Sequence, residues 1–238
     1  MQKNKSHDKV KLTGSGKKAI FAQFRWIIIS SLVFFVSAWN INVLRAWIYF
    51  SVNFGCTLIS TMIFIKVIPE LANRRGEVQE GTKKWDKILI MLYFLGVLLI
   101  IPLFSGLDIR FNWFLIQTNT TLIIGICLYI ISFVFFQWTI IVNKYFEGTA
   151  RIQSEMDHQV IEKGPYSLIR HPGYLGMFIG GISFPLIVGS FWGLIAYIPF
   201  TVVLIVRTSL EDKMLVDELE GYKIYTVKTK YRLIPFIW

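Results

Sequence analysis

The stretch that decides the fold is residues 174–206, YLGMFIGGISFPLIVGSFWGLIAYIPFTVVLIV, which contains no charged residue. It is too long for one bilayer crossing, because a membrane-spanning helix needs about 20 apolar residues. Gly189 and Ser190 lie near its middle, and Pro185 and Pro199 flank that point. Gly and Pro punctuate secondary structure, so the stretch predicts two short helices joined in a hairpin.

Four more apolar blocks precede this stretch, at residues 26–38, 47–68, 88–105 and 121–142. The 238-residue chain is 54% hydrophobic, and its apolar residues are concentrated in these blocks. The pattern predicts an all-α polytopic membrane protein with about six transmembrane helices, the last two being the hairpin. The length suits a single domain spanning residues 1–238.

The Lys and Arg residues are distributed unevenly between the predicted connections. Of the 25 Lys and Arg residues, only Arg45 and Arg110 fall in connections assigned to the side opposite the termini. The positive-inside rule therefore predicts that both termini lie in the cytoplasm. Topology and contact with anionic lipid also account for the net charge of +10, so we expect no nucleic-acid partner.

The sequence contains few residues of the kind that bind metal ions. Cys56 and Cys127 are isolated inside predicted spans, and His7, His158 and His171 lie far apart. No two of them have the spacing of a metal site. We therefore expect no metal.

The character of the chain changes near residue 143. We expect residues 1–20 to form a disordered Lys-rich tail, residues 21–142 a helical scaffold, and residues 143–238 the cofactor-binding and catalytic half. The first four predicted spans carry no embedded charge, which argues against a proton-coupled transporter. The polar loop at residues 69–87 is interpreted as a solvated cytoplasmic connection.

The stretch GPYSLIRHPGYLG, residues 164–176, is polar and irregular at the entrance to the hairpin. Pro165 and Pro172 forbid a continuous helix and favour extended geometry at the residues before them, Gly164 and His171. Glycines here would let a ligand approach the backbone closely, which favours a binding loop. The alternative is a helix entry decorated with interfacial aromatic and basic residues. The GxxxG of Gly176 and Gly180 is better explained by close helix packing.

Residues 207–222 predict an amphipathic C-terminal helix on the cytoplasmic side. Arg207, Glu211, Leu215, Leu219 and Tyr222 share one stripe of that helix. The apolar part of the stripe must face the protein or the membrane interface, so Arg207 and Glu211 point inward. They could form a structural ion pair or hold a charged ligand, and a helix lying on the membrane surface fits nearly as well.

Three segments together carry a family resemblance: HQVIEKGPYSLIRHPGYLGMFIGG from His158, RTSLEDKMLVDELEGYKIY from Arg207, and the terminal YRLIPFIW. They resemble the isoprenylcysteine carboxyl methyltransferase family, which belongs to a wider group of membrane methyltransferases that includes phospholipid methyltransferases. The resemblance covers roughly the last 90 residues. Here Glu211-Asp212 stands where the family has two glutamates.

The resemblance implies an S-adenosylmethionine-dependent membrane methyltransferase with a cytoplasm-facing cofactor pocket. The methyl acceptor would be a lipophilic small molecule or lipidated molecule that enters from the bilayer, such as an isoprenylcysteine-type carboxylate. Arg207 and Glu211 match residues expected to be catalytic, Arg207 toward the methyl acceptor. The residues expected to bind the cofactor are Gln153, His158, Gln159, Val160, Ile161, Tyr166, His171, Pro172, Gly173, Tyr174 and Glu211.

Two alternatives stay open at the level of sequence. Membrane sterol reductases end in a similar R-H-P-x-Y segment and use NADPH, although the acidic pair before Leu215 fits the methyltransferases better. A non-enzymatic membrane scaffold protein is the other alternative. The sequence does not distinguish a prenylated cysteine from a phospholipid amine or a small hydrophobic thiol or acid as the methyl acceptor.

Overall fold

A computed structural model describes residues 10–238, and all the regular secondary structure in that range is helical. The first half contains α1 (Gly14–Ala38), α2 (Leu44–Lys66), α3 (Pro69–Arg75), α4 (Lys84–Leu95), the π-helical turn η1 (Gly96–Ile100), α5 (Ile101–Phe111) and α6 (Asn119–Val142). The second half contains the 3₁₀ turns η2 (Ser154–Met156) and η3 (Gly164–Ser167), then α7 (Pro172–Val188), α8 (Phe191–Glu218) and α9 (Tyr222–Lys228).

Five helices in the described range are long and apolar enough to cross a membrane. They are α1, α2, the continuous helix Lys84–Phe111, α6 and α8, while α7 is a shorter apolar helix of 17 residues. The prediction of an all-α polytopic membrane protein is therefore confirmed. Counting α7, the apolar helices correspond in order to the six predicted spans.

The end of the chain differs from the prediction in two respects. The hairpin turn falls at Gly189, whose positive φ of 77° ends α7, and the Ser190 side chain caps α8. However, α8 is not short, because it continues for 28 residues through Arg207 to Glu218. The separate amphipathic helix predicted for residues 207–222 is thus wrong: its first part extends α8, and Tyr222 begins α9 after a break at Gly221.

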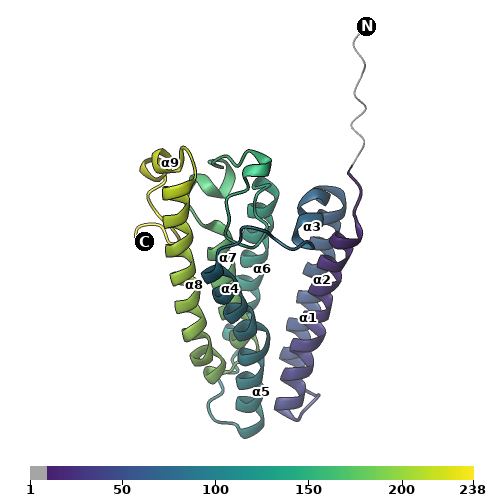
Figure 1. Cartoon of the computed structure of the whole chain (residues 1–238). Coiled ribbons are helices and arrows are strands. Elements are labelled where there is room, and N and C mark those ends of the chain that lie inside the picture. The colour runs from purple at the N-terminus through teal and green to yellow at the C-terminus, as the bar shows by residue number, and fades with distance from the viewer. Residues whose placement is uncertain (1–9) are drawn as a thin grey trace.

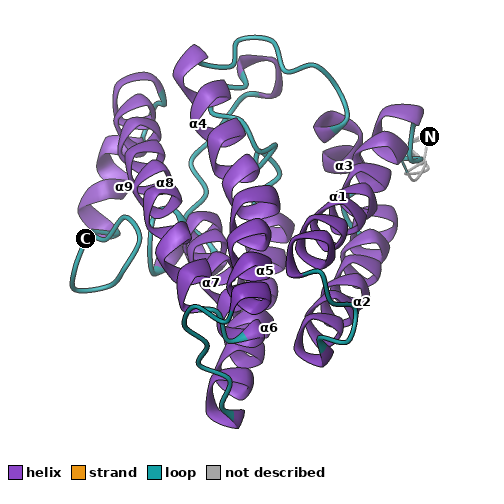
Figure 2. Cartoon of the chain, turned by 90° about the horizontal axis from the view of Figure 1, so that it is seen from below, coloured by secondary structure: helices purple, strands orange, loops and turns teal. Residues whose placement is uncertain are grey.

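The helices form two groups that stand side by side (Figure 1). Seen along the helix axes, α1, α2 and α3 occupy one side, and α8 and α9 lie on the far side of α5, α6 and α7 (Figure 2). The start of α1, α3, α9 and the α6–α7 connection lie at one end of the bundle (Figure 1). Arg45 and Arg110, predicted to lie in connections, belong to the first turn of α2 and the last turn of α5, at the opposite end of the bundle.

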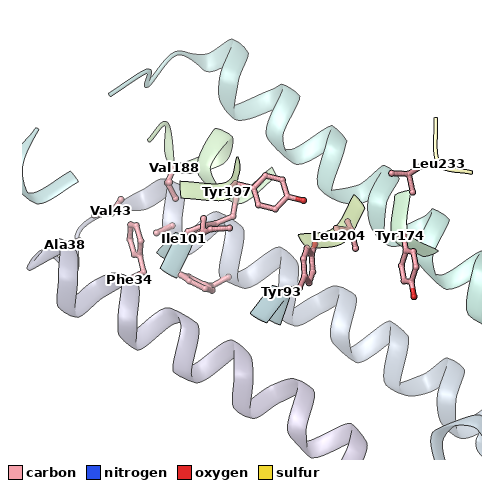
Figure 3. Packing of buried hydrophobic residues seen from close by; sticks show 13 residues of the cluster. Phe34, Ala38, Val43, Tyr93, Ile101, Tyr174, Val188, Tyr197, Leu204 and Leu233 are labelled. Carbon is pink, nitrogen blue, oxygen red and sulfur yellow. The ribbon is translucent and has the colours of Figure 1, made fainter. Parts of the chain in front are cut away.

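The core between these groups is mostly aromatic and aliphatic. It includes Phe34 of α1, Tyr93 of α4, Leu204 of α8 and Tyr174 of α7, each almost inaccessible to solvent (Figure 3). The Tyr93 hydroxyl donates to the Met177 carbonyl oxygen at 2.7 Å. Burying apolar side chains stabilises packing, and this hydrogen bond fixes α4 against α7 just below the polar end.

The helices α6 and α7 make the most extensive contact in the described part of the bundle, and small residues lie in it. The Ser132 hydroxyl of α6 donates to the Gly176 carbonyl oxygen at 2.7 Å, and a Cβ on Gly180 would lie 2.7 Å from the same hydroxyl. Small residues let helix backbones approach in membranes. The packing role expected for this GxxxG is therefore confirmed.

Two polar segments are more ordered than the sequence predicts. Residues 14–20, predicted to lie in a disordered tail, belong to α1, and residues 1–9 lie outside the described range. The 69–87 loop is not merely a solvated connection. It contains α3, whose Arg74 pairs with Glu147 at 2.9 Å and whose Arg75 donates to the Phe146 carbonyl oxygen. This loop therefore anchors the segment that follows α6.

Candidate active site

A pocket of about 770 Å³, counted with its open mouth, lies at the polar end of α7 and α8. Its walls are residues 143–151, residues 158–161, the start of α7, and the facing sides of α8 and α9. This volume includes space open to solvent, so the pocket is an open cleft between segments that are far apart in the sequence.

The Gly-Pro and His-Pro pairs shape one wall of this pocket. Residues 164–167 form a single 3₁₀ turn, and α7 begins at Pro172, so the predicted break in the helix is confirmed. Gly164 is not extended as expected. It has a φ of +61°, which favours glycine, and a side chain there would meet Trp138. His171 has a φ of −123°, as expected before proline.

Asp212 is the most heavily bonded carboxylate at this end of the molecule. It accepts from Arg170 Nε at 2.8 Å and Nη2 at 3.0 Å, and from Arg232 Nε at 2.8 Å. The Tyr222 hydroxyl donates to it at 3.0 Å, and His171 Nε2 lies at 3.1 Å. Buried charges need such partners. Asp212 thus joins the R-H-P turn, α8, α9 and the C-terminal segment at one point.

The C-terminal segment completes this arrangement through its backbone. The backbone N–H groups of Arg170 and His171 donate to the carbonyl oxygens of Tyr231 and Arg232, each at 2.9 Å. The Arg170 side chain also donates to the carbonyl oxygens of Thr229 and Lys230. The terminal YRLIP motif therefore holds the irregular R-H-P backbone, because no helix satisfies the N–H groups of Arg170 and His171.

Arg207 and Glu211 both line the pocket, but they have different partners. Arg207 Nε donates to Asp86 Oδ1 at 2.6 Å, Nη2 donates to the Gly148 carbonyl oxygen at 2.9 Å, and the guanidinium lies 4.7 Å from the Tyr174 ring centroid. Glu211 accepts a hydrogen bond from the Tyr174 hydroxyl. Arg207 is 2% exposed. Both point inward, as the stripe on the helix predicts.

His158 lines the pocket as a neutral imidazole. Burial, together with the nearby Arg151, lowers the pKa of His158 to about 4. The backbone N–H of Gln153 donates to its Nδ1 at 3.3 Å, and its ring packs 4.2 Å from that of Tyr145. Nε2 is then the protonated nitrogen at neutral pH. A neutral ring here supplies a donor and an aromatic face without adding positive charge.

The pocket gathers most of the residues expected from sequence. Those that line it are His158, Gln159, Val160, Ile161, Tyr166, His171, Gly173, Tyr174, Arg207 and Glu211. Gln153 and Pro172 do not. Gln153 is buried behind the wall, where its Nε2 donates to the Tyr145 carbonyl oxygen at 2.7 Å, and Pro172 is the first residue of α7. A Cβ on Gly173 would lie 2.5 Å from the Phe146 ring, so protein fills the space expected for a ligand.

Sequence reasoning missed several residues of this site. Asp86 comes from α4, and Tyr145, Phe146 and Glu147 come from the segment after α6. Asp86 is fully buried and is the third residue of its helix. In the sequence, Asp86 is only an acidic residue beside an apolar block. That pattern is too common to indicate a functional residue. Asp212 stands out in the sequence only as half of an acidic pair.

Comparison with known proteins bears on the region that builds the pocket. The sequence model of the isoprenylcysteine carboxyl methyltransferase (ICMT) family matches residues 123–217. This part of the chain is similar to the ICMT family. The match covers most of α6, all of α7 and most of α8, but neither Asp86 nor the terminal YRLIPFIW. A search of curated proteins finds no match to the chain.

The match to the ICMT family, together with the apolar helices, supports a membrane methyltransferase. Within residues 10–238, no cluster of three or more His, Cys, Asp or Glu side chains could hold a metal ion. The polar groups of the pocket are instead carboxylates, arginines, a neutral imidazole and aromatic rings. This donor set suits binding and orienting an organic ligand.

Proposed function

We propose that this protein is an S-adenosylmethionine-dependent methyltransferase whose cofactor binds in the pocket between the α6–α7 connection and α8–α9. The observation that carries the proposal is that the pocket contains nearly all the residues that the family resemblance assigns to the cofactor. The cofactor supplies an activated methyl group on a sulfonium sulfur. The protein then mainly has to align this group with the methyl acceptor.

The pocket chemistry matches the charges of this cofactor. The Glu211 carboxylate suits its ammonium group, and the rings of Tyr145, Tyr166 and Tyr174 offer faces for a sulfonium or an adenine. Burial raises the pKa of the Tyr166 hydroxyl, which therefore stays protonated at neutral pH. Pro172 and Gln153 would act indirectly. Pro172 begins α7, and Gln153 binds the backbone of Tyr145 from behind the pocket wall.

A second cavity supports a lipophilic methyl acceptor. It measures about 1,340 Å³, counted with its open mouth, between α1, α2, α4 and α7, and its lining is mainly apolar. It reaches Gly180, while the cofactor pocket reaches Tyr174 on the same helix. Six residues of α-helix rise about 9 Å. A hydrocarbon chain held in this cavity would therefore place its polar end near the methyl group.

Arg207 would act toward the methyl acceptor, as the resemblance implies. Its hydrogen bonds to Asp86 and Gly148 use Nε and Nη2, which leaves Nη1 for an incoming anion such as a carboxylate. A carboxylate oxygen takes the methyl group as the carbon–sulfur bond breaks, so no proton has to move. His171, bonded to Asp212, would then contact the cofactor without acting as a base.

The proposal includes an orientation in the membrane. We expect the pocket end of the bundle and both termini to face the cytoplasm, because nearly all Lys and Arg fall in the tails and connections assigned to that end. The cofactor would then enter from the aqueous side and the methyl acceptor from the bilayer. No nucleic-acid or metal partner is expected.

Titration calorimetry of the purified protein with S-adenosylhomocysteine tests the proposal, with NADPH as the competing ligand. We expect saturable binding of S-adenosylhomocysteine alone, weakened at least about tenfold in Glu211→Gln because a charge-assisted hydrogen bond is lost. Asp217→Asn, on the exposed side of the same helix, is the matched control and should bind normally. Binding of NADPH instead would assign the protein to the reductases, and binding of neither by folded protein would favour a scaffold.

A transfer assay would then identify the methyl acceptor. With radiolabelled S-adenosylmethionine, we expect label to enter S-farnesylcysteine but not S-methylcysteine, which has the same carboxylate without the hydrocarbon chain. Ser30→Phe would fill the second cavity and should reduce this transfer while leaving S-adenosylhomocysteine affinity unchanged. Transfer to phosphatidylethanolamine instead would make the acceptor a phospholipid amine.

A further inference from the structure

Asp86 lies outside the part of the chain that the ICMT family model matches, yet it contacts residues of the pocket. It is fully buried in the first turn of α4. Its Oδ1 accepts from Arg207 Nε at 2.6 Å, and its Oδ2 accepts from the Ala150 backbone N–H at 2.7 Å. The Lys83 N–H donates back to the Ala150 carbonyl oxygen at 3.2 Å. The beginning of α4 therefore holds both a pocket arginine and a pocket loop.

Arg207 has two carboxylates within reach of its position on α8. Glu211 follows it by four residues, the spacing at which opposite charges on a helix normally pair. Across residues 10–238, however, the ion pair of Arg207 is with Asp86, and Glu211 is bonded to the Tyr174 hydroxyl. Asp86 thus engages the guanidinium that this spacing would allow to pair with Glu211.

We propose that Asp86 is a positioning residue that holds the Arg207 guanidinium so that it does not pair with Glu211, which leaves the Glu211 carboxylate available to the cationic amino group of the cofactor. This inference rests on the proposed function and extends it to α4. Asp86 acts through Arg207 and the Gly148–Ala150 backbone, and it does not line the pocket itself. The scaffold half of the chain therefore contributes to ligand affinity.

The test is a set of four proteins titrated with S-adenosylhomocysteine: the wild type, two Asp86 variants and a control. Asp86→Asn keeps the shape but removes the charge, so Arg207 turns to Glu211 and the affinity falls about tenfold. Adding Arg207→Gln to Asp86→Asn removes the competitor, so the affinity should return to within about threefold of the wild type. Such a rescue does not follow from damage to the fold alone.

Asp108→Asn is the matched control. Asp108 is also fully buried on the same continuous helix, at its other end, where it accepts hydrogen bonds from Phe114, Ser190 and Trp192. Its substitution removes a buried charge in the same way but should leave affinity unchanged in folded protein. If Asp86→Asn does not fold, Asp86→Glu, which keeps the charge, must bind within about threefold of the wild type.

The outcomes separate this inference from the proposed function. The role of Asp86 is overturned if Asp86→Asn binds S-adenosylhomocysteine as tightly as the wild type. It is also overturned if the double variant binds no more tightly than Asp86→Asn. Neither result contradicts the proposed cofactor pocket. Equal losses in Asp86→Asn and Asp108→Asn overturn the role of Asp86 as well, because the effect would then be one of general stability. A wild-type protein that binds no S-adenosylhomocysteine overturns the proposed function, and this inference with it.

Discussion

At the scale of single residues, three buried carboxylates at the pocket end each bind a different set of partners. Asp212 joins four elements, Asp86 pairs with Arg207, and Glu147 pairs with Arg74 and Arg151. In each pair the carboxylate side chain is almost fully buried. Removing one partner of a buried pair leaves the other charge uncompensated. The protein then loses more free energy of unfolding than the intact pair contributes.

Asp212→Asn should therefore destabilise the protein strongly. Arg170 and Arg232 lose their shared counter-ion, and breaking a buried pair costs about 3–5 kcal/mol of the free energy of unfolding. Denaturant unfolding in detergent measures this change. Asp217→Asn, on the exposed side of the same helix, should change the free energy by no more than about 0.5 kcal/mol. Equal effects of the two substitutions would show that Asp212 does not hold these elements together.

His158 predicts a pH dependence of stability. Its pKa is about 4 in the folded chain against 6.5 for an ordinary histidine, so the unfolded state binds the extra proton between these values. Stability should be full above pH 6.5 and fall as the pH drops toward 4. In His158→Gln, the loss of melting temperature between about pH 7 and about pH 5 should be smaller than in the wild type. Identical losses would show that His158 titrates normally.

At the scale of elements, the pocket depends on close contacts between α7 and its neighbours. Gly173 stands in the first turn of α7, against the ring of Phe146 from the segment after α6. Any larger residue must displace that ring, and Phe146 lines the pocket. The same helix packs against α6 through Gly176 and Gly180, so α7 cannot easily move away from Phe146.

Gly173→Ala should accordingly weaken S-adenosylhomocysteine binding by about tenfold, because the added methyl group would lie 2.5 Å from Phe146 Cζ. Calorimetry measures the affinity. Gly55→Ala is the control, since an added Cβ there meets nothing within 4 Å in α2. It should leave the affinity unchanged and add up to about 1 kcal/mol of stability, as alanine favours helix. Unchanged affinity in Gly173→Ala would mean that Phe146 can move without affecting the ligand.

At the scale of the whole molecule, hydrophobic patterning predicted the fold far better than it predicted the partners of polar residues. The apolar blocks indicated the helices in their order, and the family motifs identified ten residues that line the pocket but none from residues 143–151. The partners of Arg207 could not be predicted, because Asp86 is distant in sequence and becomes its neighbour only when α4 packs against α8. The extension of α8 through residue 218 was missed because the polarity of residues 207–218 suggested a new element.

The division of the chain into a scaffold and a catalytic half stays a prediction, and the contact of Asp86 with Arg207 weighs against a sharp boundary. The orientation in the membrane is a second prediction at this scale. Val78, in the α3–α4 connection, and Trp113, in the α5–α6 connection, are both exposed. In a variant with Cys56 and Cys127 replaced by serine, Val78→Cys should react with a membrane-impermeant maleimide only from the cytoplasmic side. Trp113→Cys should react only from the other side, and the reverse pattern would invert the topology.

The central claim is that S-adenosylmethionine binds between the α6–α7 connection and α8–α9. Ultraviolet cross-linking of methyl-labelled S-adenosylmethionine to the purified protein, followed by peptide mapping, tests it most directly. We expect label on peptides from residues 143–174 or 207–225, reduced by excess S-adenosylhomocysteine but not by NADPH. Label confined to α1–α5, or label that S-adenosylhomocysteine does not displace, would contradict the claim.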